Sequence, residues 1–421
     1  MRFSTLQGWL DWQQGLHPSA IDLGLDRVRT VLAALAPARP RQVLTVGGTN
    51  GKGSVCAMLD AILRAAGYDV GCFTSPHLRR YNERIRIGGG EVEDGALMEA
   101  FDRIDRARGE TSLTFFEWNA LAALLAFERA GVDVAVLEVG LGGRLDAVNA
   151  VDADVAAVVS VGLDHMDWLG PTVEHIGREK AGIFRPGRVA VYGSRRTPDS
   201  IGETATRIGA RLRRLGADFD FVERPDGWDY VSTRARRSDL PLPAIPGAAQ
   251  LGNAATALAV LEAAEPALLV PDDAVRTGLQ RVRLAGRFQV VEGQPEWVLD
   301  VAHNPDAARV LREGLLARPV AGLTRAVCGV LGDKDVAGIG AALAGAVDDW
   351  CAVRLDGPRA LPEAELAGRL EAAVGRSVVQ APSVAAGCAT TLARSGPGDR
   401  ILVFGSFLTV GAALEWLDLP T

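Results

Sequence analysis

A glycine-rich stretch with one lysine and one serine follows a short apolar run near residue 45. The stretch reads Gly47-Gly48-Thr49-Asn50-Gly51-Lys52-Gly53-Ser54. Its glycines allow backbone N–H groups to turn inward around an anion, because no Cβ stands in the way. Residues 42–46 favour a strand, and residues 55–66 favour a helix whose N-terminus would face a bound phosphate. The stretch therefore predicts a nucleoside triphosphate site with the phosphate-binding candidates Asn50, Gly51, Lys52, Gly53 and Ser54.

The stretch departs from the generic phosphate-loop pattern at two positions. That pattern has a glycine five residues before Gly51 and a Ser or Thr directly after the lysine, whereas this chain has Val46 and Gly53. An ordinary glycine-rich turn therefore remains an alternative on the residues alone. The order of strand, loop and helix, with a single lysine, favours phosphate binding.

Polar side chains recur where the next predicted strands end. Residues 132–139 form an apolar run that contains Glu138, and the strand predicted over 155–161 is followed by Asp164 and His165. A buried carboxylate is costly unless a cation accompanies it. The carboxyl ends of strands line the ligand crevice in a doubly wound parallel sheet, so the pattern places the chemistry at that edge.

Length and composition indicate a two-domain globular protein. The chain has 421 residues, 48% hydrophobic and 23% charged, with no apolar run long enough to span a membrane. Its net charge of -7, without a basic block, argues against nucleic acid as a partner. Five scattered cysteines and the absence of a signal-like N-terminus indicate a cytoplasmic protein. Strand and helix signals restart near residue 285, which predicts domains at 1–284 and 285–421.

Eight motifs in order along the chain resemble those of folylpolyglutamate synthases, the folate-adding branch of the Mur ligase family. They are residues 48–54, 74–76, 82–85, 137–146, 164–165, 179–183, 300–305 and 332–335. The resemblance implies a Mur-ligase-like α/β fold, with an N-terminal phosphate-loop ATPase domain built on a mostly parallel sheet and a smaller Rossmann-like C-terminal domain. It also implies ATP-dependent ligation, in which a carboxylate becomes an acyl phosphate and the amine of L-glutamate displaces the phosphate.

The resemblance implies ATP and Mg2+ as cofactors, with catalytic roles for Lys52, His165 and Lys180. Ser54 and Glu138 would hold one Mg2+, and Ser75, Glu138 and His165 the second. A salt bridge for Glu138, and a histidine bonded within its loop for His165, are the structural alternatives. For Lys180 the resemblance implies carbamylation by CO2, which would turn a cation near metals into an anion. The alternative is an ammonium paired with Glu179 or another acid.

Nucleoside and glutamate binding are implied for residues on both sides of the predicted boundary. Asn253, Arg287 and Asp300 would bind adenine and ribose, which predicts ATP between the domains and closure during turnover. His303 is the candidate for L-glutamate. Interdomain ion pairing for Arg287, and helix capping for His303, remain open alternatives.

The segments His17–Leu25, 114–117 and 145–147 resemble the dihydropteroate-binding segments of bifunctional bacterial enzymes. The acceptor candidates are Asp22, Thr114, Phe115, Phe116, Glu117, Arg144, Leu145, Asp146 and Ala147. Phe115 and Phe116 would stack on a pterin, or would simply pack the start of a helix.

The chain is therefore predicted to be a monomeric, bifunctional dihydrofolate synthase and folylpolyglutamate synthase. Its substrates would be dihydropteroate, reduced folates and L-glutamate, with no membrane or nucleic acid partner. The alternatives are a monofunctional folylpolyglutamate synthase and, from another class, a nucleotide-gated binding protein or simple NTPase.

Overall fold

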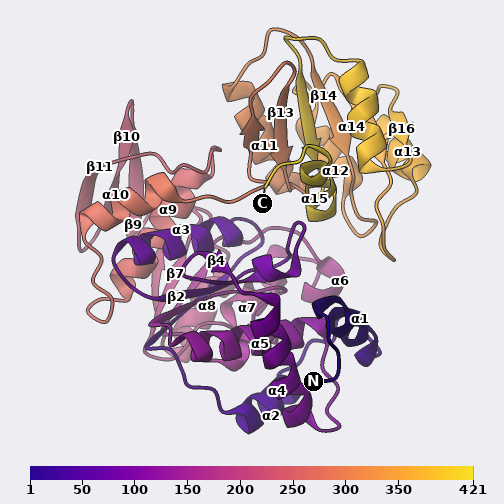
Figure 1. The fold of residues 1–421 in the computed structure, drawn as a ribbon. Helices are drawn as coiled ribbons and strands as arrows, with labels where there is room; N and C mark the ends of the chain where they lie inside the picture. The colour runs from indigo at the N-terminus through magenta and orange to yellow at the C-terminus, as the bar shows by residue number, and fades with distance from the viewer. Residues whose placement is uncertain (421) are drawn as a thin grey trace. The chain divides into compact units, whose positions relative to one another are not determined.

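The computed structural model describes residues 1–420, which form two compact units (Figure 1). The first contains Met1–Ala244 and Leu251–Val282, and the second contains Ile245–Gln250 and the chain from Arg283 onward. The chain enters the second unit at Arg283. This residue lies close to position 285, where the strand and helix signals of the sequence restart.

The first unit is built on an eight-stranded sheet in the order β4-β3-β2-β5-β1-β6-β7-β8, in which β2, β5, β1, β6, β7 and β8 are parallel. Its strands are β1 (Gln42–Gly47), β2 (Val70–Phe73), β3 (Ile85–Ile87), β4 (Gly90–Glu91), β5 (Val134–Glu138), β6 (Val155–Val158), β7 (Val189–Tyr192) and β8 (Arg211–Arg214). The central strand β5 is buried at every residue, because helices cover both faces of the sheet. The predicted parallel sheet is therefore confirmed.

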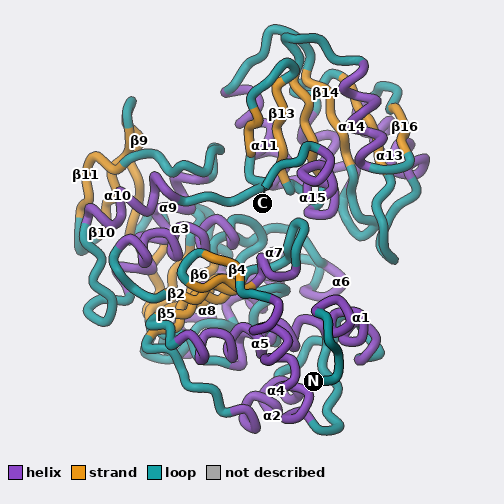
Figure 2. Tube along the Cα trace, in the orientation of Figure 1, coloured by secondary structure: helices purple, strands orange, loops and turns teal. Residues whose placement is uncertain are grey.

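Helices of the first unit surround this sheet (Figure 2). They are α1 (Leu6–Leu16), α2 (Asp26–Leu35), α3 (Lys52–Ala65), α4 (Asp94–Arg108), α5 (Phe115–Ala130), α6 (Met166–Leu169), α7 (Val173–Ala181), α8 (Asp199–Ile208), α9 (Gln250–Ala263) and α10 (Asp272–Arg281), with short 3-10 helices η1 (Tyr81–Arg84) and η2 (Ala147–Ala150). The helices α5, α7 and α8 pack on one face in a shared hydrophobic core. Helix α3 packs on β1, β2 and β5, and α10 packs on α3.

A three-stranded antiparallel sheet, which the sequence analysis did not predict, completes the first unit. Its strands are β9 (Phe219–Arg224), β10 (Gly227–Ser232) and β11 (Arg236–Leu240), in the order β11-β10-β9. Charged residues occupy many positions of β9 and β11, so neither strand has the apolar pattern of a buried strand. Asp229 at the centre of β10 accepts hydrogen bonds from Arg236 Nη2 (2.6 Å) and Arg224 Nη2 (2.5 Å), which ties the three strands together.

The second unit is a six-stranded sheet in the order β12-β13-β17-β14-β15-β16, parallel except for β12. Its strands are β12 (Gln289–Val291), β13 (Glu296–Asp300), β14 (Thr324–Cys328), β15 (Asp349–Val353), β16 (Val379–Ala381) and β17 (Arg400–Phe404). Its helices are α11 (Pro305–Ala317), α12 (Val336–Leu343), α13 (Glu363–Val374), α14 (Val384–Ala393) and α15 (Phe407–Trp416). The first three of these helices contribute to one core on one face of the sheet, as expected for the predicted Rossmann-like α/β domain.

All five cysteines are free and buried, in agreement with the scattered spacing seen in the sequence. None of the helices within residues 1–420 combines the length and apolar character needed to cross a membrane.

Candidate active site

The glycine-rich stretch forms the loop between β1 and α3, at the carboxyl edge of the sheet. Gly48 and Gly51 have positive φ values of 149° and 85°, a backbone conformation that L side chains rarely adopt. The Thr49 N–H donates to Ser160 O (2.8 Å) and the Asn50 N–H to Ser160 Oγ (2.9 Å), so the loop is fastened to the end of β6. Lys52 Nζ donates to the carbonyls of Gly48 (3.0 Å) and Thr49 (3.3 Å), which holds the ammonium over its own loop.

Gly51 is required by close packing as well as by its φ value. A Cβ there would lie 2.7 Å from Asn253 Oδ1 and 2.8 Å from Val159 Cγ1. The contact places Asn253, the predicted nucleoside-binding residue of α9, directly beside the phosphate loop.

Replacing Gly51 by alanine should therefore weaken nucleotide binding and lower the free energy of unfolding. The positive φ value alone costs about 1–2 kcal/mol for a residue with a Cβ. Gly67→Ala is the matched control, because Gly67 has a φ of 89° but no atom within 4 Å of the added Cβ. Thermal unfolding and ATP binding should show a larger loss of stability for Gly51→Ala, and weaker ATP binding in that variant alone. Equal losses and unchanged ATP affinity would contradict the packing assigned to Gly51.

Three of the four predicted metal ligands lie around the ends of β1, β2 and β5. Glu138 pairs in register with Val46 of β1, which brings its carboxylate to the start of the phosphate loop, and it is 4% exposed. The Ser75 N–H, in the loop after β2, donates to Glu138 Oε2 (3.0 Å). Ser54 is buried in the first turn of α3.

His165 lies in the loop after β6, as the N-cap residue of α6, with a positive φ of 52°. Its backbone N–H donates to Asp164 Oδ1 (2.9 Å), and its Nε2 lies 3.9 Å from the same carboxylate oxygen. These contacts match the alternative of a loop-bonded histidine and leave its proposed metal role untested.

The donor set fits Mg2+ better than a softer metal. Carboxylate and hydroxyl oxygens from Glu138, Ser54 and Ser75 are hard ligands, and Mg2+ is held by few protein groups with water and phosphate completing its shell. Residues 1–420 contain no cluster of three or more His, Cys, Asp or Glu side chains arranged to hold a metal, which is the arrangement an all-protein site would need.

Lys180 lies in the last turn of α7 and is only 4% exposed. Burial, and then the charge of Lys52, lower the pKa of its amine to about 7, while Asp164 and Asp146 act in the opposite direction. Glu179 pairs instead with Arg144, whose Nη2 lies 2.9 Å from Glu179 Oε1. The neighbouring glutamate is therefore engaged elsewhere, and Lys180 shares its surroundings with Lys52 and two carboxylates.

Asp146 is a buried carboxyl group at the N-cap of η2. It accepts hydrogen bonds from the backbone N–H groups of Leu141 (2.9 Å) and Val148 (3.0 Å). Burial raises its pKa to about 7, against the opposing effect of these backbone donors and of Lys52. Ala147 is buried next to it, and Leu145 is partly buried against the core. The acceptor candidates at 144–147 thus form one loop beside the lysines.

The remaining acceptor candidates come together at the start of α5. Arg27 Nη1 donates to Asp22 Oδ2 (2.7 Å), and Arg27 Nε donates to Glu117 Oε2 (3.3 Å), which joins the 17–25 loop to the helix. Thr114 and Glu117 form a reciprocal capping box at that helix N-terminus.

The two phenylalanines of this segment already pack within the protein. Phe116 lies against Phe73 with ring centroids 5.8 Å apart, and Phe115 lies edge-on to Tyr81 at 6.0 Å. Both remain partly exposed. These contacts agree with the alternative that Phe115 and Phe116 pack the start of α5. Stacking of either ring on a pterin stays a prediction.

In the second unit, the three candidates cluster at the carboxyl end of β13. Asp300 accepts hydrogen bonds from the backbone N–H groups of Phe288 and Ala302, both at 2.7 Å, and burial raises its pKa. The Arg287 guanidinium lies 5.1 Å from the centroid of Phe407, and the His303 ring lies 6.4 Å from the same aromatic ring. Phe407, at the start of α15, was not among the predicted residues.

Arg84 is a second residue at the site to which the sequence analysis assigned no role. Its Nε donates to His77 Nδ1 (2.8 Å), and its guanidinium lies 5.6 Å from the centroid of Phe115. Burial, followed by the charge of Arg84, lowers the pKa of His77 to about 4, so His77 is a neutral acceptor at physiological pH. Arg84 also acts electrostatically on Glu138. The sequence motif at 82–85 contains this arginine. Because a buried arginine is costly without partners, the motif could have indicated a role for it.

Two protein-family models match successive parts of the chain. The Mur ligase middle domain matches residues 46–261, and the Mur ligase glutamate ligase domain matches residues 286–407. The dihydrofolate synthase/folylpolyglutamate synthase of Escherichia coli K12 is 46% identical over 416 residues, covering 99% of this chain and 96% of that protein. The chain belongs to this branch of the Mur ligase family. The predicted family and fold class are therefore confirmed.

Solved structures of this branch agree with the fold over nearly the whole chain. The E. coli FolC complex with DHPP and ADP has a TM-score of 0.94 and 45% identity, covering 99% of this chain and 98% of that one. A bifunctional folylpolyglutamate synthase/dihydrofolate synthase with Mn, AMPPNP and L-glutamate bound has a TM-score of 0.92, with the same identity and coverage.

Proposed function

We propose that the protein is a bifunctional dihydrofolate synthase and folylpolyglutamate synthase. It joins L-glutamate to dihydropteroate and to folate glutamates, using ATP. The observation that carries this proposal is similarity over 99% of the chain to a relative with that bifunctional name. The buried Glu138 and Lys180 beside the phosphate loop supply the groups that such a reaction needs.

In the first half of the reaction, a carboxylate oxygen of the acceptor attacks the γ-phosphorus of ATP, and ADP leaves. Lys52 stabilises the charge on the transferring phosphoryl group, and backbone N–H groups of residues 50–54 hold the phosphates. Ser54, Ser75, Glu138 and His165 would hold Mg2+, which would neutralise further phosphate charge. Asn253, Arg287 and Asp300 bind the adenine and ribose.

In the second half, the neutral amine of L-glutamate attacks the acyl carbon. Phosphate leaves with one oxygen of the original carboxylate, and the amine loses a proton, so an amide remains. His303 binds the incoming glutamate in this proposal. The Arg287 and Phe407 side chains beside it give that region of the second unit a cationic and aromatic lining.

Lys180 acts as a carbamate. The neutral amine attacks the carbon of CO2, a carbon–nitrogen bond forms, and the nitrogen loses a proton to leave an anion with two oxygens. The pKa of about 7 supports this step, because it gives Lys180 a far larger neutral fraction at pH 7 than an ordinary lysine has. The change of sign relieves the repulsion between Lys180 and Lys52.

The acceptor pocket gives a prediction that separates it from the nucleotide site. Asp22→Ala and Phe116→Ala should raise the KM for dihydropteroate about tenfold or more, because a lost aromatic or charged contact costs about 1–3 kcal/mol. ATP affinity should change little, since both residues lie in segments assigned to the acceptor. The informative quantity is the change in the KM for dihydropteroate relative to the change in ATP affinity. A fall in ATP affinity with an unchanged acceptor KM would show that these residues do not serve the pterin.

Identification of products by mass tests the proposed activity directly. Purified protein would be incubated with ATP and L-glutamate, and with either dihydropteroate or tetrahydrofolate. Glutamate addition to both acceptors supports the bifunctional enzyme, and addition to tetrahydrofolate alone supports the monofunctional one. ATP hydrolysis that does not depend on glutamate would instead support a simple NTPase.

We also propose a location, an oligomeric state and a set of partners for the enzyme. Its substrates are small molecules, and it acts as a cytoplasmic monomer without nucleic acid or membrane partners. The free state of all five cysteines fits a reducing compartment.

A further inference from the structure

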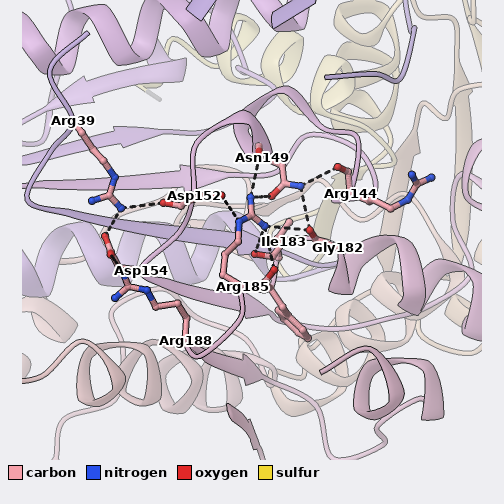
Figure 3. A network of polar contacts seen from close by, with 10 residues as sticks. Arg39, Arg144, Asn149, Asp152, Asp154, Gly182, Ile183, Arg185 and Arg188 are labelled. Atoms are coloured by element: carbon pink, nitrogen blue, oxygen red, sulfur yellow. Dashed lines mark hydrogen bonds and ion pairs between the residues drawn. The ribbon is translucent and has the colours of Figure 1, made fainter. Parts of the chain in front are cut away.

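A single buried asparagine joins the acceptor loop to the chain that follows Lys180. Asn149 lies in η2 and is 5% exposed. Its Nδ2 donates to Arg144 O in the acceptor loop (2.9 Å) and to Gly182 O just beyond α7 (3.2 Å), as Figure 3 shows. Both amide protons therefore bind backbone carbonyls, one on each side of the joint.

Arg185 fixes the orientation of this asparagine. Its Nη2 donates to Asn149 Oδ1 (2.8 Å) and to Asn149 O (3.1 Å). Its Nη1 donates to the carbonyls of Gly182 (3.4 Å), Ile183 (3.1 Å) and Phe184 (3.2 Å), and its Nε pairs with Asp152 (Figure 3). The planar guanidinium thus closes the turn after α7 and leaves the Asn149 amide one orientation in which all its groups are satisfied.

Two glycines allow the joined segments to touch through their backbones. A Cβ at Gly143 would lie 2.8 Å from the carbonyl oxygens of both Glu179 and Lys180, and a Cβ at Gly182 would lie 2.3 Å from Arg144 Cβ. The Arg144 N–H also donates to Glu179 O (2.8 Å). The acceptor loop therefore lies directly on the last turn of α7, with no side chain between them to absorb a shift.

The same asparagine also holds the backbone of Asp146, since the Asn149 N–H donates to Asp146 O (2.9 Å). We infer that Asn149 and Arg185 form a positioning clamp that holds the last turn of α7, which carries Lys180, against the acceptor loop, and thereby supports carbamylation and turnover. Neither residue touches the reacting atoms, and the inference rests on the proposed ligase function.

The test compares variants that break the clamp at different points. Asn149→Asp keeps the oxygen that accepts from Arg185 and loses the donors to Arg144 O and Gly182 O. Arg185→Lys keeps the positive charge and loses the planar fork. Arg188→Ala is the matched control, because the Arg188 side chain pairs with Asp154 in the same network (3.3 Å; Figure 3). Its bond to the turn after α7 runs from the backbone N–H to Arg185 O (3.2 Å), which the alanine variant keeps.

We expect Asn149→Asp to lower kcat on the order of 10²-fold, the cost of misplacing a reacting group by about an ångström. Arg185→Lys should show a smaller loss of the same kind, and the KM for ATP should stay close to the wild-type value in both. Incorporation of isotopically labelled bicarbonate into the protein should fall in both variants. Excess bicarbonate should restore part of the kcat, which a loss of fold would not allow.

Wild-type kcat and label incorporation in both clamp variants would overturn the inference. A lower kcat with full label incorporation and no response to bicarbonate would also overturn it. Failure of the wild-type protein to ligate glutamate is a separate outcome, which contradicts the proposed function and the clamp together. Arg188→Ala should behave as wild type throughout, and an equal loss there would show that the whole network serves stability alone.

Discussion

Lys52→Ala should abolish ligation while leaving the melting temperature nearly unchanged. The ammonium donates to two carbonyls of its own loop, which are local contacts, so its removal costs the fold little. Loss of a charge aimed at the transferring phosphoryl group typically costs on the order of 10²-fold or more in rate. The measurements are ligation rate, ATP affinity and thermal unfolding.

Arg106→Ala serves as the control for loss of a positive charge elsewhere, because the Arg106 side chain is 74% exposed and pairs with Asp102 of the same helix, α4. It should ligate at the wild-type rate. Normal turnover by Lys52→Ala, at an unchanged melting temperature, would exclude the phosphate-loop assignment.

Lys180→Ala should be nearly inactive, with a loss on the order of 10²–10³-fold, because it removes a charged group at the centre of the site. Short carboxylic acids should restore part of this activity, since they can enter the space left by the side chain and supply an anion. Lys180→Arg should be equally inactive and should not respond to them, because it keeps the cation and fills that space.

The wild-type enzyme should also depend on pH in a defined direction. Only the neutral amine reacts with CO2, and the neutral fraction of Lys180 falls as the pH drops through about 7. In buffers depleted of bicarbonate, activity should therefore decline on the acid side, and added bicarbonate should raise it most there. The carbamate would be excluded by two results together: a pH profile that does not change when bicarbonate is added, and a Lys180→Ala variant that carboxylic acids do not rescue.

The parallel sheets and the edge that carries the site were predictable from the sequence. The run around Glu138 is apolar because β5 is buried on both faces, and the polar residues after β5 and β6 lie at one sheet edge because the strands are parallel. The glycines at 48 and 51 signalled the loop between β1 and α3, since its backbone requires positive φ values.

Other parts depend on contacts that no local pattern reveals. The β9 to β11 sheet buries Trp228 and Tyr230 of β10, but charged residues interrupt the apolar pattern of β9 and β11. The bonds that Asp229 accepts from two arginines, which join the strands, are visible only in the tertiary structure. Asn149 and Arg185 bind backbone carbonyls from three segments, so their residue types carry no signal until the fold brings those carbonyls together. The engagement of Glu179 with Arg144 likewise needed the tertiary structure, because 35 residues separate the two in sequence.

Transfer of an oxygen label tests the central claim, ligation through an acyl phosphate, most directly. Dihydropteroate with a heavy oxygen isotope at both carboxylate oxygens would be converted with ATP and L-glutamate, and the released inorganic phosphate analysed by mass. Attack of the carboxylate on the γ-phosphorus predicts one labelled oxygen in the phosphate for each amide formed. Amide formation with unlabelled phosphate would contradict the proposed mechanism.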